Sequence, residues 1–408
     1  MKNVYLDYAA TTPMDPEVIK EIEKHYRVTY GNPSSFHKIG QNAAQILQKS
    51  REIVASLINA KTDEIFFTSS GTESDNLAIK GVAFKNKGRG NHIITSSIEH
   101  HAVQHTCQYL ETQGFKVTYL PVDEYGLIDL KELEETITNK TILISIMFAN
   151  NEIGTIEPIK EIGEIAKKHD VIFHTDAVQT LGKVPIDVEE MNIDLLSASA
   201  HKLYGPKGVG LLYIRGHGVR KGWGKYIEPL FHGGGHERGL RSSTENVPGI
   251  AGFAKAVELC KRNMKEESEK LIKFRDKIIK VITENIEDVY LNGHHTKRLP
   301  NNVNLGFRYI EGESIILSLD MEGIATSTGS ACSSKSLEPS HVLLAIGQKP
   351  EDLHGSLRIT TGRYTTEADI DYFLEKLPPI IEKLRKISPL KKGKKYTFDP
   401  TYETNHHH

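Results

Sequence analysis

Strand-like and helix-like patterns alternate through the first two-thirds of this chain, and the alternation restricts its fold more than any other feature. Short apolar runs such as EIFFT at 64–68, HIITS at 92–96 and VIFHT at 171–175 are separated by helical patterns of ten or more residues. Such alternation is typical of βαβ units, whose strands lie mostly parallel in one sheet. Sheets of this kind bind ligands at the carboxyl ends of their strands, so functional residues are expected there.

The pattern changes after Thr244. Residues 248–280 predict one or two long helices, and the runs at 301–307, 311–319 and 356–362 predict shorter, more separated strands. A last helix is expected at about 369–385. The sequence therefore predicts an α/β protein with a large domain and a smaller α+β domain.

The expected boundaries follow from these patterns. We place a large domain at 15–260, a small domain at 1–14 and 261–388, and a C-terminal tail at 389–408. His406, His407 and His408 resemble the remains of a purification tag and are excluded from the fold prediction. The run KKGKK in the tail predicts a solvated segment.

Composition excludes several classes of function. A net charge of -2 over 408 residues lacks the basic excess that nucleic acids attract. The longest apolar run, 142–149, is too short to span a bilayer, and the N-terminus has no secretory h-region. Three cysteines cannot form a disulfide framework. These features predict a globular, cytoplasmic protein without a membrane or nucleic acid as partner.

The segment SASAHKLYGPKGVGLLYI, from Ser197 to Ile214, carries a lysine between small residues and an apolar strand. Lysine is costly to bury, and a desolvated amine has a lowered pKa and attacks aldehydes. Lys202 is thus a candidate Schiff-base lysine. Taken alone, a surface lysine at a loop is the commoner explanation.

Two upstream segments change that balance. Asp176 follows the strand at 171–175, where a carboxylate can pair with a protonated pyridine nitrogen, although an N-cap or turn aspartate is common. Small residues in TSSGTES lead into a helix at about Glu73, which predicts a phosphate site, although an ordinary capping box fits as well. Neither GxGxxG nor a Walker loop is present there.

The order of phosphate loop, ring-nitrogen acid and lysine resembles a fold type I pyridoxal-phosphate enzyme. More closely, the chain resembles group I cysteine desulfurases of the NifS/IscS type, within the class V aminotransferase superfamily. The resemblance covers essentially the whole chain, from YLDYAATTP at 5–13 to GRYTTEADID at 362–371. It rests on SGTES, IEHHAV, NNEIGT, DAVQT, SAHKLYGPKG, HGGGHERGLRS and STGSACSS. It implies a mostly parallel seven-stranded sheet flanked by helices, with pyridoxal 5'-phosphate as cofactor.

The resemblance also implies a role for each matching residue. Lys202 should form the Schiff base, His100 should stack on the pyridine ring and move protons, Asp176 should hold the ring nitrogen, and Gln179 should bond the phenolic oxygen. The phosphate should be held by Gly71, Thr72, Ser199 and His201, and by Thr244 reaching across a homodimer interface. Asn151 should contact cofactor and substrate, and Arg358 should clamp the carboxylate of L-cysteine, for which a bidentate guanidinium is suited.

Cys332 distinguishes a desulfurase from a transaminase. It lies in STGSACSSKSLEPSH, a Gly- and Ser-rich stretch that predicts a mobile loop able to carry a persulfide. Its thiol needs a lowered pKa or a nearby base, and His100 is the candidate. Cys107 and Cys260 continue helical apolar patterns and are expected to be structural.

Two departures from the family pattern are visible. Ser243 stands where the family usually has glycine, and residues 218–229 look like an insertion to which we assign no function. His101 and His105, four apart on one helix, could form half a metal site, but no third ligand is evident. His232 and His236 are expected in a subunit-interface loop.

Other functions remain open at this point. A selenocysteine lyase differs from a desulfurase mainly in the acidity of its leaving group, and STGSAC disfavours an aminotransferase. A non-catalytic assembly protein is disfavoured by the retained Lys202, Asp176, His100 and Cys332. The sulfur acceptor could be an iron–sulfur scaffold, a tRNA-modifying protein or a nitrogenase-related scaffold, and the tail after Ser388 is one docking candidate.

Overall fold

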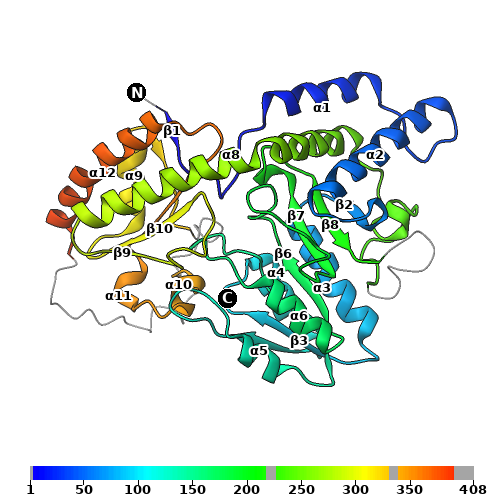
Figure 1. Ribbon diagram of the computed structural model, residues 1–408, viewed down its shortest axis with the longest axis horizontal. Helices are drawn as coiled ribbons and strands as arrows, with labels where there is room; N and C mark the ends of the chain where they lie inside the picture. The colour runs from blue at the N-terminus through cyan, green and yellow to red at the C-terminus, as the bar shows by residue number, and fades with distance from the viewer. Residues whose placement is uncertain (1–2, 217–226, 330–338, 390–408) are drawn as a thin grey trace, which may run out of the picture.

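The computed structural model describes residues 3–216, 227–329 and 339–389. Its centre is a seven-stranded sheet with the spatial order β2-β8-β7-β6-β5-β3-β4 (Figure 1). Only β8 runs antiparallel to its neighbours. The strands are β2 (Ile65–Thr68), β8 (Gly210–Ile214), β7 (Leu195–Ser199), β6 (Ile172–Asp176), β5 (Thr141–Ser145), β3 (His92–Ser96) and β4 (Lys116–Leu120).

Helices cover both faces of this sheet, because alternate strand residues point to opposite sides. Phe67 and Phe173 pack on the face that holds α1, α2, α5, α6 and the first half of α8. Phe66 and Ile172 pack on the opposite face, under α3 and α4. The helices are α1 (Pro16–Val28), α2 (Lys38–Leu57), α3 (Gly71–Asn86), α4 (His101–Thr112), α5 (Leu130–Thr136), α6 (Ile159–Lys168) and α8 (Val247–Asn285).

A smaller α+β part contains its own apolar core. Its three-stranded sheet has the order β12-β10-β9, and β1 pairs with β11 beside it. Its elements are β1 (Val4–Tyr5), β9 (Val289–Leu291), β10 (Asn302–Phe307), α9 (Gly312–Met321), β11 (Ile324–Ala325), α10 (His341–Ala345), α11 (Pro350–Leu353), β12 (Ser356–Thr360) and α12 (Glu367–Ile387).

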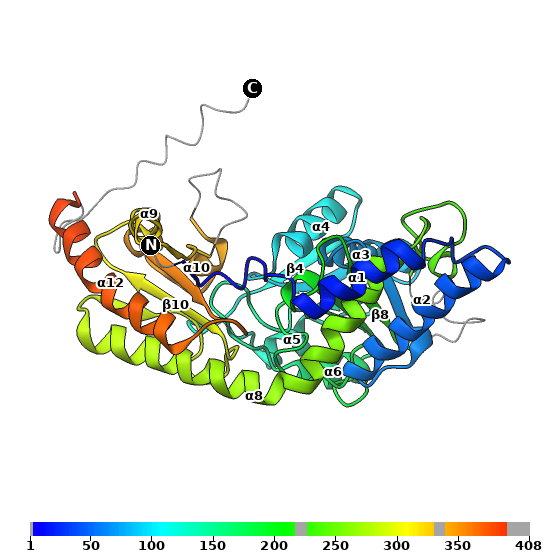
Figure 2. The ribbon, with the colours of Figure 1, turned by 90° about the horizontal axis from the view of Figure 1, so that it is seen from above.

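Helix α8 joins the two parts as one element of 39 residues, and it runs along both in Figures 1 and 2. Its first half packs in the core of the large sheet and its second half in the core of the small one. The domain boundary that we expect near residue 260 falls inside this helix and stays a prediction.

One predicted strand is wrong. Residues 311–319 form most of α9, not a strand, and Ile315 and Leu319 are its fully buried residues. Four residues separate these two side chains, which is the spacing of one helix face. None of the helices in the described part of the chain is both long and apolar enough to cross a membrane.

Candidate active site

The expected functional residues gather at one edge of the central sheet. Because β2, β3, β5, β6 and β7 are parallel, their carboxyl ends meet there. The segments that follow these strands contain Gly71, His100, Asn151, Asp176 and Lys202. The structure thus brings these five positions to the edge where α/β proteins bind their ligands.

Lys202 ends the short 3-10 helix η2 (Ala200–Lys202), directly after β7. Its Nζ donates hydrogen bonds to the carbonyl oxygens of Ala9 and Ala10, at 2.5 and 2.8 Å. Gln179 donates from Nε2 to the same Ala9 oxygen at 3.0 Å. The N-terminal segment therefore forms one wall of the site.

Asp176 is the last residue of β6, with 7% of its surface exposed. Its Oδ1 accepts a hydrogen bond from the Val178 amide at 2.8 Å. Burial raises the pKa of Asp176 to about 6, while that hydrogen bond and the charge of Lys202 oppose the rise. A nearby cation, such as a protonated ring nitrogen, would favour the ionised form further.

More ionisable groups lie behind Asp176. Burial and the charge of Asp176 raise the pKa of the fully buried Asp75, whose Oδ1 has no hydrogen-bond partner. His174 hydrogen-bonds Ser145 and Ser197, both at 2.9 Å, and burial lowers its pKa to about 3. His174 is thus neutral at neutral pH, burial favours the protonated form of Asp75, and the sequence analysis assigns neither residue a role.

His100 is the N-cap of α4, and its Nδ1 accepts from the Ala102 amide at 3.1 Å. Burial, with the charge of Lys202, lowers the pKa of His100 to about 4. It is therefore a neutral imidazole at neutral pH, and so a base. His100 and Thr72 line one pocket between α3 and α4.

The expected phosphate residues lie around the first turn of α3. Ser70 caps this helix, so that the following amides point outward. A Cβ built on Gly71 would lie 2.6 Å from Val178 Cγ2 and 3.6 Å from Ser199 Cβ, so only glycine fits there. His201 Nδ1 lies 3.1 Å from Thr11 Oγ1.

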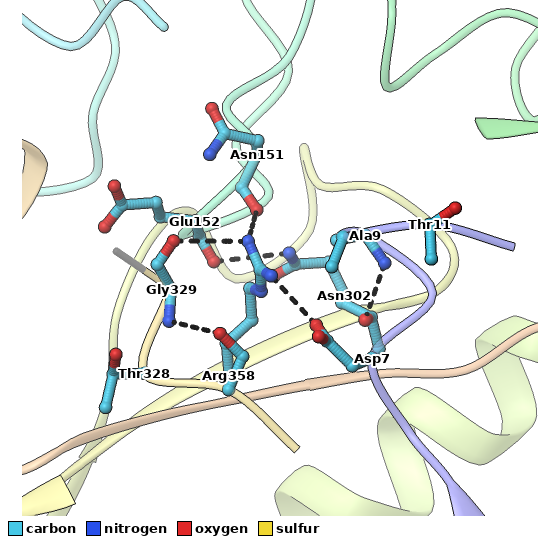
Figure 3. A network of polar contacts seen from close by, with 12 residues as sticks. Asp7, Ala9, Thr11, Asn151, Glu152, Asn302, Thr328, Gly329 and Arg358 are labelled. Carbon is cyan, nitrogen blue, oxygen red and sulfur yellow. Dashed lines mark hydrogen bonds and ion pairs between the residues drawn. The ribbon is translucent and has the colours of Figure 1, made fainter. Parts of the chain in front are cut away.

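Arg358 lies in β12, and 3% of its side chain is exposed. Its Nη1 donates to the carbonyl oxygens of Asn151 and Gly329, at 3.0 and 3.4 Å, and its Nη2 pairs with Asp7 Oδ1 at 2.9 Å (Figure 3). Asn151 thus meets Arg358 through its backbone, and its amide points away from the guanidinium. No chemical role was assigned to Asp7 from the sequence, although it lies within YLDYAATTP.

Two predicted site residues, Thr244 and Cys332, have no described contact with the rest of the site. Thr244 is exposed in the segment before α8, and its contact with a partner's phosphate stays a prediction. Cys332 lies outside the described residues, as does most of the expected insertion at 218–229. Cys107 and Cys260 are buried, and burial raises the pKa of both thiols.

His101 and His105 stack with ring centroids 4.8 Å apart, and His341 lies 4.9 Å from His101. Among the described residues, no group of three His, Cys, Asp or Glu side chains is arranged to hold a metal ion. The third histidine comes from α10, which the spacing within one helix could not reveal.

Comparison with known proteins shows the family to which this chain belongs. The family described as Aminotransferase class-V matches residues 4–373. The cysteine desulfurase IscS of Clostridium botulinum is 56% identical over 391 residues, which are 95% of this chain and 97% of the relative. The IscS of Dictyoglomus turgidum is 55% identical over 390 residues, with 96% and 97% covered.

Solved structures agree. A NifS-like protein has a TM-score of 0.87 and 41% identity, covering 94% of this chain and 100% of that one. The structure described as SspA in complex with cysteine has a TM-score of 0.78 and 39% identity, covering 89% and 100%. The chain therefore belongs to the class V aminotransferase family and, within it, to the NifS/IscS group of cysteine desulfurases.

Proposed function

We propose that this chain is a pyridoxal-phosphate-dependent cysteine desulfurase, which leaves L-alanine and carries the sulfur of L-cysteine as a persulfide on Cys332. The proposal rests on Lys202, Asp176 and His100, which lie at the carboxyl edge of the central sheet, and on Arg358, which reaches from β12 to the Asn151 carbonyl. The cysteine named in the SspA structure supports the substrate. The IscS relatives support a role in supplying sulfur.

The residues present fit the cofactor. The Ser70 cap leaves amides of the first turn of α3 pointing outward, which suits a phosphate, and Gly71 lets this turn pack closely against Val178 and Ser199. Asp176 is a buried carboxyl whose pKa is raised by burial, so a cation placed beside it would be stabilised by its ionised form. When bound, pyridoxal phosphate supplies an aldehyde for amines and a ring that withdraws electrons from the substrate α-carbon.

The chain's own groups would then act as follows. Arg358 binds the substrate carboxylate, and the free amine of Lys202 removes the α-proton. The neutral imidazole of His100 accepts a proton from a thiol. The thiolate of Cys332 attacks the substrate sulfur. As the S–S bond forms, the C–S bond breaks, and its electron pair stays with the carbon fragment. This fragment gains a proton at Cβ and regains the α-proton from Lys202, which gives alanine.

The test is the absorption spectrum of the purified protein before and after addition of L-cysteine. A visible band that shifts, with alanine and sulfide released under reductant, is the expected result. Cys332→Ser should keep the band and lose the persulfide. A protein that stays colourless after incubation with pyridoxal phosphate would refute the proposal, and a strong preference for selenocysteine would change its substrate.

We also propose that the enzyme works as a homodimer, in which Thr244 reaches the phosphate of the partner. The chain from the end of α1 to the start of α2 exposes large apolar side chains: Tyr26, Val28, Tyr30, Phe36 and Ile39. Such a patch favours a protein interface. A monomeric mass in light scattering, or unchanged cofactor affinity in Thr244→Ala, would contradict this arrangement.

The persulfide must pass to an acceptor, for which we propose an iron–sulfur scaffold or another thiolation protein. The tail after Ser388 is the proposed docking segment. Removing residues 389–408 should leave alanine formation unchanged and slow sulfur transfer to the acceptor. Equal transfer rates with and without the tail would exclude it.

A further inference from the structure

Asp7 holds the arginine that is expected to bind substrate. Its Oδ1 lies 2.9 Å from Nη2 of Arg358, and Figure 3 shows the two side chains pointing toward one another. The other terminal nitrogen of Arg358 donates to the backbone carbonyls of Asn151 and Gly329. Three fixed acceptors thus surround the guanidinium.

Backbone pairing sets this contact. The Thr360 amide donates to Leu6 O at 2.8 Å, and the Tyr8 amide donates to Thr360 O at 3.3 Å. Asp7 therefore lies beside β12, with its neighbours bonded to the residue two positions beyond Arg358. The Tyr5 hydroxyl also donates to the carbonyls of Asp7 and Thr11, both at 2.9 Å, which fixes the turn after Asp7.

Asp7 also supplies charge. Arg358 is almost fully buried, and Asp7 is its sole ion-pair partner in the described part of the chain. A buried guanidinium without a counter-ion is strongly destabilising. Carbonyl oxygens accept its hydrogen bonds but bring no net charge, so Asp7 neutralises it before a substrate arrives.

The remaining donor of Arg358 is Nε, which is buried and has no hydrogen-bond partner in the described structure. Buried donors are normally satisfied, so an unpaired one marks a place for a ligand. A carboxylate needs two N–H groups in one plane. The contacts of Nη1 and Nη2 fix that plane and leave Nε as the donor without a partner among the described residues.

We propose that Asp7 is a positioning residue for substrate binding: it fixes the plane and the charge of Arg358 so that the carboxylate of an amino acid meets a preset donor edge. This inference rests on the proposed function. Asp7 does not contact the reacting atoms in this arrangement. Loss of its carboxylate should therefore weaken substrate binding more than it slows the chemical step.

The test is made on the cofactor-loaded enzyme. L-Alanine, which cannot lose sulfur, is titrated while the cofactor spectrum is followed, so that its Kd is measured without turnover. Asp7→Asn keeps an acceptor but loses the charge, and we expect its Kd to rise about tenfold. The KM for L-cysteine should rise equally, with kcat changed less than about threefold.

Asp194→Asn is the matched control. Asp194 pairs with Arg215 at 3.4 Å, at the amino end of β7 in the central sheet, and its replacement should change the melting temperature but not the Kd. Asp7→Glu, which keeps the charge, should retain a Kd within about threefold of the wild type.

Three results would overturn the inference. An unchanged Kd in Asp7→Asn would leave Asp7 a merely structural role. A lowered Kd would make Asp7 a competitor of the substrate. A loss in Asp7→Glu as large as in Asp7→Asn would show that the charge does not matter. If the wild type itself binds neither pyridoxal phosphate nor L-alanine, the proposed function fails instead.

Discussion

At the scale of single residues, the environment of each carboxyl group decides its protonation. Glu99 is fully buried between β3 and His100, and burial raises its pKa to about 8, although Ser96 and the Met147 amide donate to its Oε1. Its Oε2 has no hydrogen-bond partner. Glu99 is therefore mostly protonated at neutral pH.

This protonation predicts a pH dependence of stability. The folded state binds the Glu99 proton more tightly than the unfolded state, so its contribution is complete below the ordinary glutamate pKa and is lost as pH rises to about 8. Over that range the free energy of unfolding should fall by about 1.4 kcal/mol per pH unit from this group. Glu99→Gln should flatten the fall, as measured by urea unfolding at pH 6 and 8.5. A parallel pH profile in the variant would contradict the assignment.

Ser243 offers a second prediction at this scale. Its φ of 154° lies in a region that residues with a Cβ rarely adopt, and the family usually has glycine here. Ser243→Gly should therefore raise the free energy of unfolding by about 1 kcal/mol. The neighbouring Ser242→Gly should lower it instead, because Ser242 is not among the positive-φ residues. Thermal unfolding of both variants distinguishes strain from a general effect of glycine.

At the scale of elements, the sequence predicts strands and helices best where their lengths differ. The strands of the central sheet are four or five residues long and lie between much longer helical patterns. The run at 311–319 is short and apolar, and periodicity does not separate a buried strand from a buried helix at that length. Its environment decides: α9 packs on the small core through Ile315 and Leu319, above β12 and beside α12.

Two isoleucines of helix α8 differ in burial, which predicts different effects of their replacement. Ile278 is fully buried in the core of the small part, whereas Ile272 on the same helix is 38% exposed. Ile278→Ala should lower the free energy of unfolding by about 2–5 kcal/mol, because it removes core contacts and leaves a cavity. Ile272→Ala should cost less than about 1 kcal/mol. Similar losses in denaturant unfolding would mean that α8 is not anchored through this face.

At the scale of the whole molecule, Arg363 joins segments from three regions of the chain. It donates to Asp15 at 2.8 Å and to Glu267 at 3.0 Å, and its guanidinium lies 4.2 Å from the ring centroid of Tyr204. Tyr204 follows Lys202 by two residues, and Arg363 follows Arg358 by five. This cluster thus fixes the turn after Lys202 relative to β12, the strand that carries Arg358.

Breaking this cluster should destabilise the whole fold. Arg363→Met leaves two half-buried carboxylates without their cation and should cost about 3 kcal/mol. Lys277→Met removes the exposed pairs with Glu367 and Asp371 and should cost less than about 1 kcal/mol. The comparison is made by chemical unfolding of the two variants, and equal losses would show that the cluster adds nothing beyond surface charge.

The active site could be predicted from sequence only within its local segments. Lys202, Asp176 and His100 can be proposed from the sequence because each lies at or just after the end of a recognisable strand, and their roles stay predictions. Asp7 and the carbonyls of Ala9 and Ala10 were not, because their partners lie far along the chain and a backbone carbonyl has no sequence signal. Contacts between distant segments follow from the pairing of β1 with β11 and of the N-terminal segment with β12, which no local pattern specifies.

The pairing of Asp7 with Arg358 has a consequence for biosynthesis. Proteins emerge from the ribosome from the N-terminus, and domains fold in that order as they appear. The segment at 7–12 is made among the first, but its partner strand at 356–360 is made among the last. A nascent chain can therefore build the large sheet and its lysine long before it can bind a substrate carboxylate. If Arg358 binds the substrate as proposed, the complete site can therefore form only when synthesis is nearly finished.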